Sequence, residues 1–246
     1  MRHLDLFSGI GGFALAARWA GIETVAFCEI EEFPRKVLQK NFPGVPIHRD
    51  IHDLDGSEYE GIDLITGGYP CQPFSLAGKR RGAEDDRHLW PEMRRVIAQA
   101  KPTWVVCENV YGHVTMGLDE VLADLESEGY AAQSFVVPAC AKDAPHRRDR
   151  VWIVANAYCL RLSDTCERAT EKSSEEQSWR TTIENGDLNC LVRYIPRGAQ
   201  DDWWRAQSEM DRSCDGIPDR VDRLKSLGNA IVPQVAYEIL RTIRAV

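Results

Sequence analysis

Residues 67–75 hold a cysteine in a setting that suits a reactive thiol. Cys71 follows an apolar run that predicts a strand, glycines precede it, and a proline stands on either side of the Cys-Gln pair. Pro70 restricts its own backbone and that of the preceding residue, so the thiol is held in place. Turn formers are poor surroundings for a buried structural cysteine, whereas loops that follow strands often carry function. The segment therefore indicates a cysteine nucleophile.

A second segment, residues 5–12, has the composition of a cofactor-binding turn. It reads Asp-Leu-Phe-Ser-Gly-Ile-Gly-Gly, and glycines between a strand and a helix let a ligand approach the backbone. Glu29, roughly 20 residues further on, has the usual place of an acid that binds ribose hydroxyls. Asp50 can accept a hydrogen bond from an adenine amino group, while Ile51 covers the ring. The pattern favours a nucleotide-like cofactor; a nicotinamide-binding domain and a purely structural turn are the alternatives.

The elements that must position these residues alternate along residues 1–157. Short apolar runs predict strands and helical stretches lie between them, which is typical of an α/β fold with a mostly parallel sheet and helices on both faces. In such sheets, ligands bind at the carboxyl ends of the strands. The predicted strands are 3–7, 24–30, 46–51, 62–66, 104–110, 134–138 and 151–155. The predicted helices are 12–20, 32–41, 89–100 and 118–128.

Composition divides the chain into three parts. Residues 1–157 are expected to form a catalytic and cofactor-binding domain. Residues 158–219 are polar, rich in Ser, Thr, Glu and Arg, and have no clear periodicity. Residues 220–246 return to a regular pattern, and Pro233 fits the first turn of a helix that packs back on the main domain.

Further motifs follow the first two over nearly the whole chain. The complete series is residues 5–12, Pro70-Cys71-Gln72, Glu108-Asn109-Val110, His146-Arg147-Arg148-Asp149-Arg150 and Gly228-Asn229. In this order the motifs resemble those of the DNA (cytosine-5)-methyltransferase family of bacteria and phages. The resemblance implies a Rossmann-like methyltransferase fold, S-adenosyl-L-methionine as cofactor and double-stranded DNA as partner. Residues 158–219 would then be a small target recognition region.

The chemistry of such a reaction agrees with the residues present. Carbon 5 of cytosine is too weak a nucleophile to attack a methyl sulfonium unaided. A thiolate that adds at carbon 6, here Cys71, converts the ring to an enamine, and Arg148 and Arg150 can supply the positive charge that favours the thiolate. The resemblance implies that Glu108 stabilises the ring at N3, that Arg150 contacts the base and that Asn109 supports the site. The base that removes the proton from carbon 5 is not identified by the sequence.

Residues 75–86 form a long, basic segment flanked by glycines. A target cytosine is buried in the duplex, so the enzyme must flip it out and cover it. We interpret this segment as a mobile loop that closes over the flipped base, with an ordinary flexible surface loop as the alternative. The residues expected to contact the substrate are Gln72, Ser75, Lys79, Arg80, Arg81 and Asn109. Those expected to contact the cofactor are Phe7, Gly9, Gly11, Gly12, Glu29, Ile30, Asp50, Ile51, Pro70, Asn229 and Ala230.

The chain departs from the family pattern in several places. His146 stands where the family has Gln, and it can still form a hydrogen bond. Ile30 stands where relatives carry a larger aromatic residue over the adenine, and Ala230 follows the Gly-Asn motif. The short recognition region is the larger departure, because a region of this size buries little by itself. A loose sequence specificity, or a weak or inactive enzyme, is therefore an alternative.

Composition narrows the remaining classes of protein. No apolar run is long enough to span a membrane and no signal peptide is evident, so we expect a cytoplasmic protein and a monomer. With a net charge of −8, contacts to DNA must come from local basic clusters. The 8 cysteines form no CxxC pair, so we expect reduced thiols and no metal site. Cys28, Cys107 and Cys140 lie in apolar runs that are typical of a core.

Three other functions are alternatives to this one. One branch of the family methylates tRNA and carries a Cys-Phe-Thr element, which this sequence lacks. A catalytically silent DNA-binding or regulatory relative is opposed by Cys71, Glu108 and Arg150, but the short recognition region favours it. A nicotinamide-dependent oxidoreductase leaves Pro-Cys-Gln and Glu-Asn-Val unexplained.

Overall fold

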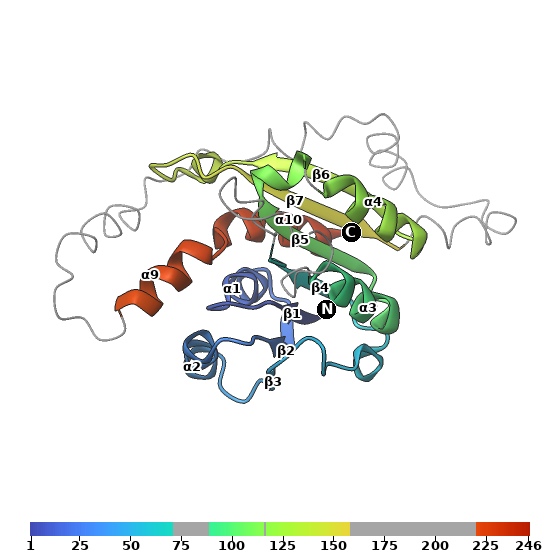
Figure 1. The fold of residues 1–246 in the computed structure, drawn as a ribbon, viewed down its shortest axis with the longest axis horizontal. Helices are drawn as coiled ribbons and strands as arrows, with labels where there is room; N and C mark the ends of the chain where they lie inside the picture. The colour runs from blue at the N-terminus through green and yellow to red at the C-terminus, as the bar shows by residue number, and fades with distance from the viewer. Residues whose placement is uncertain (71–88, 116, 158–219) are drawn as a thin grey trace, which may run out of the picture.

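The structure is a computed structural model and describes residues 1–70, 89–115, 117–157 and 220–246. In this part of the chain the strands form one 7-stranded sheet in the order β3-β2-β1-β4-β5-β7-β6 (Figure 1). The pairs β1/β2, β1/β4, β2/β3 and β4/β5 are parallel, and β7 is antiparallel to β5 and β6. The strands are β1 (Arg2–Leu6), β2 (Glu23–Cys28), β3 (Ile47–His48), β4 (Leu64–Gly67), β5 (Trp104–Val110), β6 (Ala131–Val137) and β7 (Arg150–Asn156).

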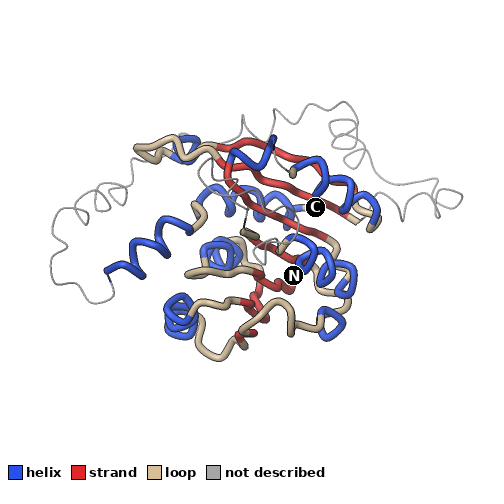
Figure 2. The backbone as a smooth tube through the Cα atoms, viewed as in Figure 1, coloured by secondary structure: helices blue, strands red, loops and turns tan. Residues whose placement is uncertain are grey.

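Helices cover both faces of the sheet (Figure 2). Successive residues of a strand point to opposite faces, so Val106 packs with α1 and α10, whereas Val105 and Cys107 pack with α3 and α4. Among the residues described here, no helix is long and apolar enough to cross a membrane. The helices are α1 (Gly12–Trp19), α2 (Glu32–Asn41), α3 (Trp90–Ala100), α4 (Leu118–Ser127), α9 (Arg220–Asn229) and α10 (Pro233–Ala245).

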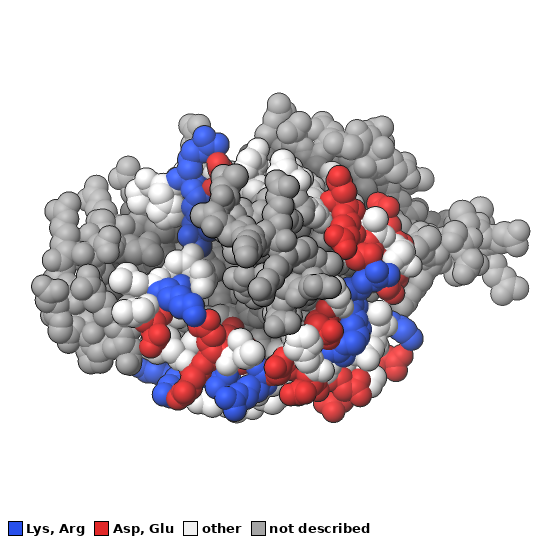
Figure 3. All heavy atoms as spheres, in the orientation of Figure 1, with Lys and Arg blue, Asp and Glu red and all other residues white. Residues whose placement is uncertain are grey.

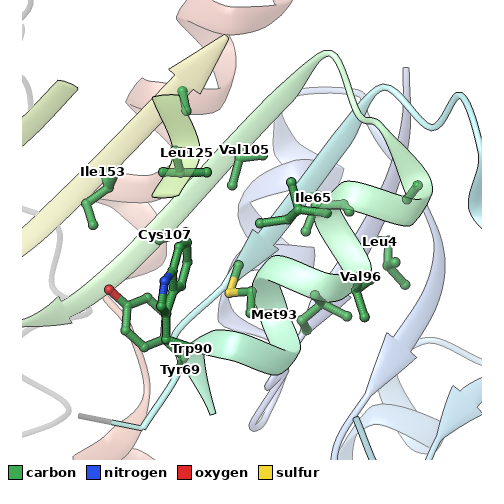
Figure 4. Packing of buried hydrophobic residues seen from close by; sticks show 14 of the residues in the cluster. Leu4, Ile65, Tyr69, Trp90, Met93, Val96, Val105, Cys107, Leu125 and Ile153 are labelled. Carbon is green, nitrogen blue, oxygen red and sulfur yellow. The ribbon is translucent and has the colours of Figure 1, made fainter. Parts of the chain in front are cut away.

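The core beneath α3 reaches the edge of the sheet where the predicted functional residues gather. In Figure 4, Met93 of α3 lies near Ile65 of β4, and Trp90 lies beside Tyr69, which follows β4. Trp90 is 2% exposed, and its indole Nε1 donates to Asp124 Oδ2 at 2.8 Å. The segment after β4 therefore packs against a buried side chain of α3 that has its own hydrogen bond to α4.

The predicted α/β fold is confirmed, and its elements follow in the predicted order with small shifts at their ends. The helix expected at Pro233 is α10, with the proline in its first turn, and it packs on α1. The strand predicted at 46–51 is shorter, Ile47–His48. Pro46 has no N–H for a ladder, and Asp50 ends the strand in a turn because its Oδ1 accepts from the backbone N of His52 at 3.0 Å.

The cysteine predictions are confirmed at two positions and wrong at a third. Cys28 and Cys107 are buried in the core, as expected. Cys140 is exposed. It lies in a 3-10 helix, Ala139–Lys142, that follows β6 at the end of the sheet, where Ala139 is the buried residue instead.

Candidate active site

The glycine turn and Glu29 form one hydrogen-bonded unit at the carboxyl ends of β1 and β2. Glu29 Oε2 accepts from the backbone N of Gly9 at 2.7 Å, and Oε1 accepts from that of Glu31 at 2.8 Å. Burial raises the pKa of the Glu29 carboxyl, while these two donors oppose the shift. Gly11 has a φ of 88°, and an added Cβ there would lie 2.9 Å from the Phe42 ring, so the turn requires glycine.

The residues predicted to hold an adenosine lie next to this unit. Ile30 follows Glu29 and is 63% exposed, so its side chain is available to a ligand. Asp50 is half-buried and Ile51 is buried. Burial, together with the charges of Glu29 and Asp50, raises the pKa of the Cys28 thiol to about 12. The two carboxylates therefore lie near one thiol, at one end of the sheet.

A buried hydrogen-bonded chain below the turn was not predicted from the sequence. Thr66 Oγ1 donates to Asp5 Oδ1 at 2.8 Å, and the same hydroxyl lies 2.7 Å from His3 Nε2. His3 Nδ1 lies 2.9 Å from Thr24 Oγ1. Burial raises the pKa of Asp5 well above its usual value and lowers that of His3 to about 3, so both favour their uncharged forms. Polar residues two apart in an apolar strand were the signal available for them.

The segment that leads to the predicted nucleophile is held against β5. Asn109 Nδ2 donates to the carbonyl of Tyr69 at 3.2 Å. A Cβ added at Gly68 would lie 3.5 Å from Glu108 Oε2, so this carboxylate lies beside the backbone of the segment. Cys71 follows Tyr69 by two positions in the sequence. The described residues just before Cys71 therefore lie close to Glu108, the acid that the resemblance assigns to the same reaction.

Part of the predicted site lies outside the described residues. This applies to Cys71, to Gln72, to the segment 75–86 and to the recognition region 158–219. Their roles therefore stay predictions. The same holds for the expected substrate contacts Ser75, Lys79, Arg80 and Arg81.

Glu108 and Arg150 form an ion pair at the end of β5. Arg150 Nε lies 3.0 Å from Glu108 Oε1, and Glu108 is 8% exposed. The antiparallel register places Val110 opposite Arg150, from which the guanidinium reaches back to the carboxylate. Burial raises the pKa of Glu108 to about 7, against the opposing charges of Arg150 and Arg148. A carboxyl that is half protonated near neutral pH can exchange a proton with a ring nitrogen.

Arg148 contacts the C-terminal Gly-Asn motif. Its Nη2 donates to the carbonyl of Gly228 at 2.6 Å and to that of Ala230 at 2.8 Å. The residue has a φ of 41°, in the left-handed region. Burial lowers the pKa of Arg148, the charge of Arg150 lowers it too, and Glu108 raises it. The arginine thus joins the motif near Asn229 to the start of β7, besides adding positive charge beside Glu108.

The described site residues gather at one edge of the sheet. The glycine turn follows β1, Glu29 follows β2, Gly68 follows β4 and Glu108 lies near the end of β5. A ligand on the glycine turn would therefore share one sheet edge with the Glu108–Arg150 pair, with β4 between β1 and β5. Within the described ranges, no group of His, Cys, Asp or Glu side chains is arranged to hold a metal ion.

Gly12 offers a test of how tightly the C-terminal motif packs on the cofactor turn. An added Cβ at Gly12 would lie 2.6 Å from Ile231 Cγ1. We expect Gly12→Ala to lower the free energy of unfolding by about 1–3 kcal/mol, because Ile231 or the turn must move. Thermal melts would measure this loss.

The control for Gly12 is Gly228→Ala, because no atom lies within 4 Å of a Cβ added at Gly228. This variant should melt no lower than the wild type, since alanine favours a helix more than glycine does. Adding Ile231→Ala to Gly12→Ala should recover part of the loss in a double-mutant cycle. Equal melting of Gly12→Ala and the wild type would contradict the packing argument.

Comparison with known proteins places this geometry in context. A family model described as C-5 cytosine-specific DNA methylase matches residues 1–194. The Type II methyltransferase M2.BsuMI of Bacillus subtilis (strain 168) is 34% identical over 170 residues, which cover 64% of this chain and 42% of that protein. M.HgiCII of Herpetosiphon aurantiacus is 30% identical over 197 residues, which cover 78% of this chain and 45% of that protein. The chain thus spans less than half the length of these relatives.

A solved structure shows a similar fold. It is a putative DNA modification methyltransferase encoded within a prophage of E. coli, with 25% identity and a TM-score of 0.56. The match covers 71% of this chain and 49% of that one.

Proposed function

Because this chain belongs to the C-5 cytosine-specific DNA methylase family, we propose that it transfers a methyl group from S-adenosyl-L-methionine to carbon 5 of cytosine in double-stranded DNA. The observation that carries the proposal is the buried Glu108–Arg150 pair beside Gly68. This pair lies at the sheet edge that also holds the glycine turn, and the chain reaches the same edge at Gly68, three positions before Cys71 in the sequence. Acid and cofactor turn thus share one sheet edge, and we propose that Cys71 acts there as well.

The residues at the ends of β1, β2 and β3 fit S-adenosyl-L-methionine. Each Glu29 oxygen accepts one backbone hydrogen bond and keeps a lone pair for a ribose hydroxyl. The exposed side chain of Ile30 can cover the adenine, and Asp50 can accept from its amino group. When bound, the cofactor supplies an electrophilic methyl group. The other proposed contacts are Phe7, Gly9, Gly11, Gly12, Ile51, Pro70, Asn229 and Ala230.

The protein's own side chains then act at different atoms of the cytosine. The Cys71 thiolate adds to carbon 6, and the electron pair of the C5–C6 double bond takes up the methyl group at carbon 5. Glu108 supplies a proton at N3, and Arg150 orients that carboxyl and contacts the base. A base then removes the proton from carbon 5, the double bond forms again as the thiolate leaves, and the proton at N3 returns to the Glu108 carboxylate.

Acidic side chains repel the phosphates of duplex DNA, so we expect basic side chains at the DNA contact. On the face in Figure 3, acidic side chains gather over α4, which carries Asp119 and Glu120 in its first turn. Arg147, with 82% of its side chain exposed, lies three positions before the start of β7 and pairs with Asp149 at 3.0 Å. We propose phosphate contacts at Arg147 and at the basic residues of segment 75–86.

The direct test incubates the protein with labelled S-adenosyl-L-methionine and either duplex DNA or tRNA. We expect label in DNA alone, recovered as 5-methylcytosine after digestion to nucleosides. Label in tRNA alone would overturn the DNA substrate and favour the tRNA branch. Binding of duplex DNA without any transfer would favour the silent relative.

Glu29→Ala tests the cofactor assignment separately. We expect the affinity for S-adenosyl-L-methionine, measured by calorimetry, to fall at least about tenfold, because charge-assisted hydrogen bonds are lost from the ligand and from the turn. Glu23→Ala is the control, since Glu23 is an exposed acid at the opposite end of β2. An unchanged affinity in Glu29→Ala would place the cofactor elsewhere.

A further inference from the structure

Tyr69 and His113 form a buried pair that the reaction steps above do not use. The Tyr69 hydroxyl lies 2.7 Å from His113 Nε2, although the residues are 44 positions apart. Their ring centroids are 5.5 Å apart at an interplanar angle of 76°. The two residues are 3% and 6% exposed. The pair joins the segment after β4 to the 3-10 helix Tyr111–Thr115, which directly follows β5.

Tyr69 is also held by neighbours on its other sides. Its ring lies 5.1 Å from that of Trp90 between centroids, and Figure 4 shows the two side by side. Trp90 is itself fixed by its hydrogen bond to Asp124. At the backbone, Asn109 donates to the Tyr69 carbonyl. The ring, the carbonyl and the hydroxyl of Tyr69 therefore each have a defined contact.

His113 is placed just as closely. A Cβ added at Gly117 would lie 3.0 Å from His113 Cε1, so the imidazole is packed against the turn before α4. Its helix starts at the residue after Val110, the last residue of β5. The position of the imidazole is consequently set by the strand that also carries Glu108.

We propose that Tyr69 and His113 are positioning residues for Cys71, an inference that rests on the proposed methyl transfer. Asn109 holds the carbonyl of Tyr69 and His113 holds its hydroxyl, so this residue is tied both to β5, the strand of Glu108, and to the helix that directly follows it. Cys71 is only two positions further along the chain. The approach of thiol and carboxyl to one cytosine depends on these ties, and a misplacement of about 1 Å can cost about 10²-fold in rate.

The test measures how fast the full-length protein forms a covalent adduct with duplex DNA that contains 5-fluorocytosine, in the presence of S-adenosyl-L-methionine. Tyr69→Phe removes the hydroxyl and keeps the ring, and we expect the rate to fall about 5- to 10-fold, the value of one buried hydrogen bond. The rate of adduct formation by His113→Leu should fall at least as far. His113→Gln, whose amide can reach the place of Nε2, should stay within about twofold of the wild type.

A second histidine–tyrosine pair provides a matched control. His48 Nε2 lies 2.6 Å from the Tyr59 hydroxyl, and the ring centroids are 5.7 Å apart at 84°. This pair lies by β3, the edge strand away from β5. Tyr59→Phe removes the same kind of hydrogen bond and should keep the wild-type rate.

Binding measurements separate positioning from a general loss of structure. Tyr69→Phe should keep the wild-type affinities for S-adenosyl-L-methionine and for duplex DNA while its adduct forms slowly. An unchanged adduct rate in Tyr69→Phe, or a loss shared equally by rate and both affinities, would overturn the inference and leave the proposed function standing. Absence of adduct with the wild-type protein would overturn the proposed function, and the inference with it.

Discussion

The Cys71→Ala variant is expected to transfer no methyl group to duplex DNA above background, a loss of at least about 10³-fold. Alanine offers no nucleophile for carbon 6, and without that addition carbon 5 stays too weak to attack a methyl sulfonium. The loss should be confined to chemistry, because most of the proposed cofactor residues follow β1, β2 and β3, and the others, Pro70 among them, are unchanged in this variant. Transfer of label into DNA and calorimetric binding of S-adenosyl-L-methionine would measure the two effects.

Cys140→Ser is the matched control, since Cys140 is an exposed thiol in the 3-10 helix after β6. It should methylate like the wild type. With duplex DNA that contains 5-fluorocytosine, the wild type and Cys140→Ser should form an adduct that survives denaturing electrophoresis, and Cys71→Ala should form none. Methyl transfer that persists in Cys71→Ala would exclude the covalent mechanism.

Glu108→Gln is expected to lower the rate of methyl transfer by about 10²- to 10³-fold and to leave cofactor affinity unchanged. Glutamine can still accept a hydrogen bond from Arg150, but it cannot pass a proton to N3. Burial raises the pKa of Glu108 to about 7, so its protonated fraction falls as the pH rises through that value. The wild-type pH–rate profile should therefore decline above about pH 7, and the residual activity of the variant should lack this decline.

Glu128→Gln is a matched control for this experiment. Glu128, the residue after α4, accepts from Arg94 Nε of α3 at 2.9 Å, which is a contact of the same kind, and it is not part of the proposed site. Its rate and its pH profile should equal those of the wild type. Identical profiles for the wild type and Glu108→Gln would contradict the role in proton transfer.

The same pKa shift predicts that Glu108→Gln is the more stable protein at alkaline pH. The carboxyl titrates at about 7 in the fold and near its ordinary value of 4.5 when unfolded, so the fold favours the protonated form. Stability linked to Glu108 is therefore fully present below about pH 4.5 and is lost as the pH rises through about 7. Since glutamine resembles the protonated form, its Tm should equal that of the wild type near pH 4.5 and exceed it by a few degrees well above the folded pKa. A lower Tm at alkaline pH would show that the ion pair with Arg150 outweighs burial.

Local pattern was enough to predict most of the fold. The strand predicted at 104–110 is β5, Trp104–Val110, and the helix predicted at 32–41 is α2, Glu32–Asn41, with the same bounds. Both follow from the spacing of apolar residues, which repeats within a few positions and needs no distant partner. Pattern failed where a local competitor intervened, as when Asp50 turned the chain and shortened β3.

The sequence by itself determined which residues could do chemistry and roughly where they lie. The order of the motifs indicated the family. The positions of Glu29 and Glu108 near the ends of predicted strands favoured one ligand-binding edge of the sheet for both. Motifs and predicted strand ends depend on residue type and on spacing along the chain, and the sequence contains both directly. Cys71 was predicted as the nucleophile in the same way, and its role stays a prediction.

Only the tertiary structure decided how these residues are paired and charged. The pKa of Glu108 is near 7 because burial raises it more than Arg150, which β7 places at 3.0 Å, lowers it. The Arg148 contacts to Gly228 and Ala230, and the Tyr69–His113 pair, likewise join residues far apart in the chain. Burial and long-range pairing are properties of the packed molecule, and no local spacing encodes them.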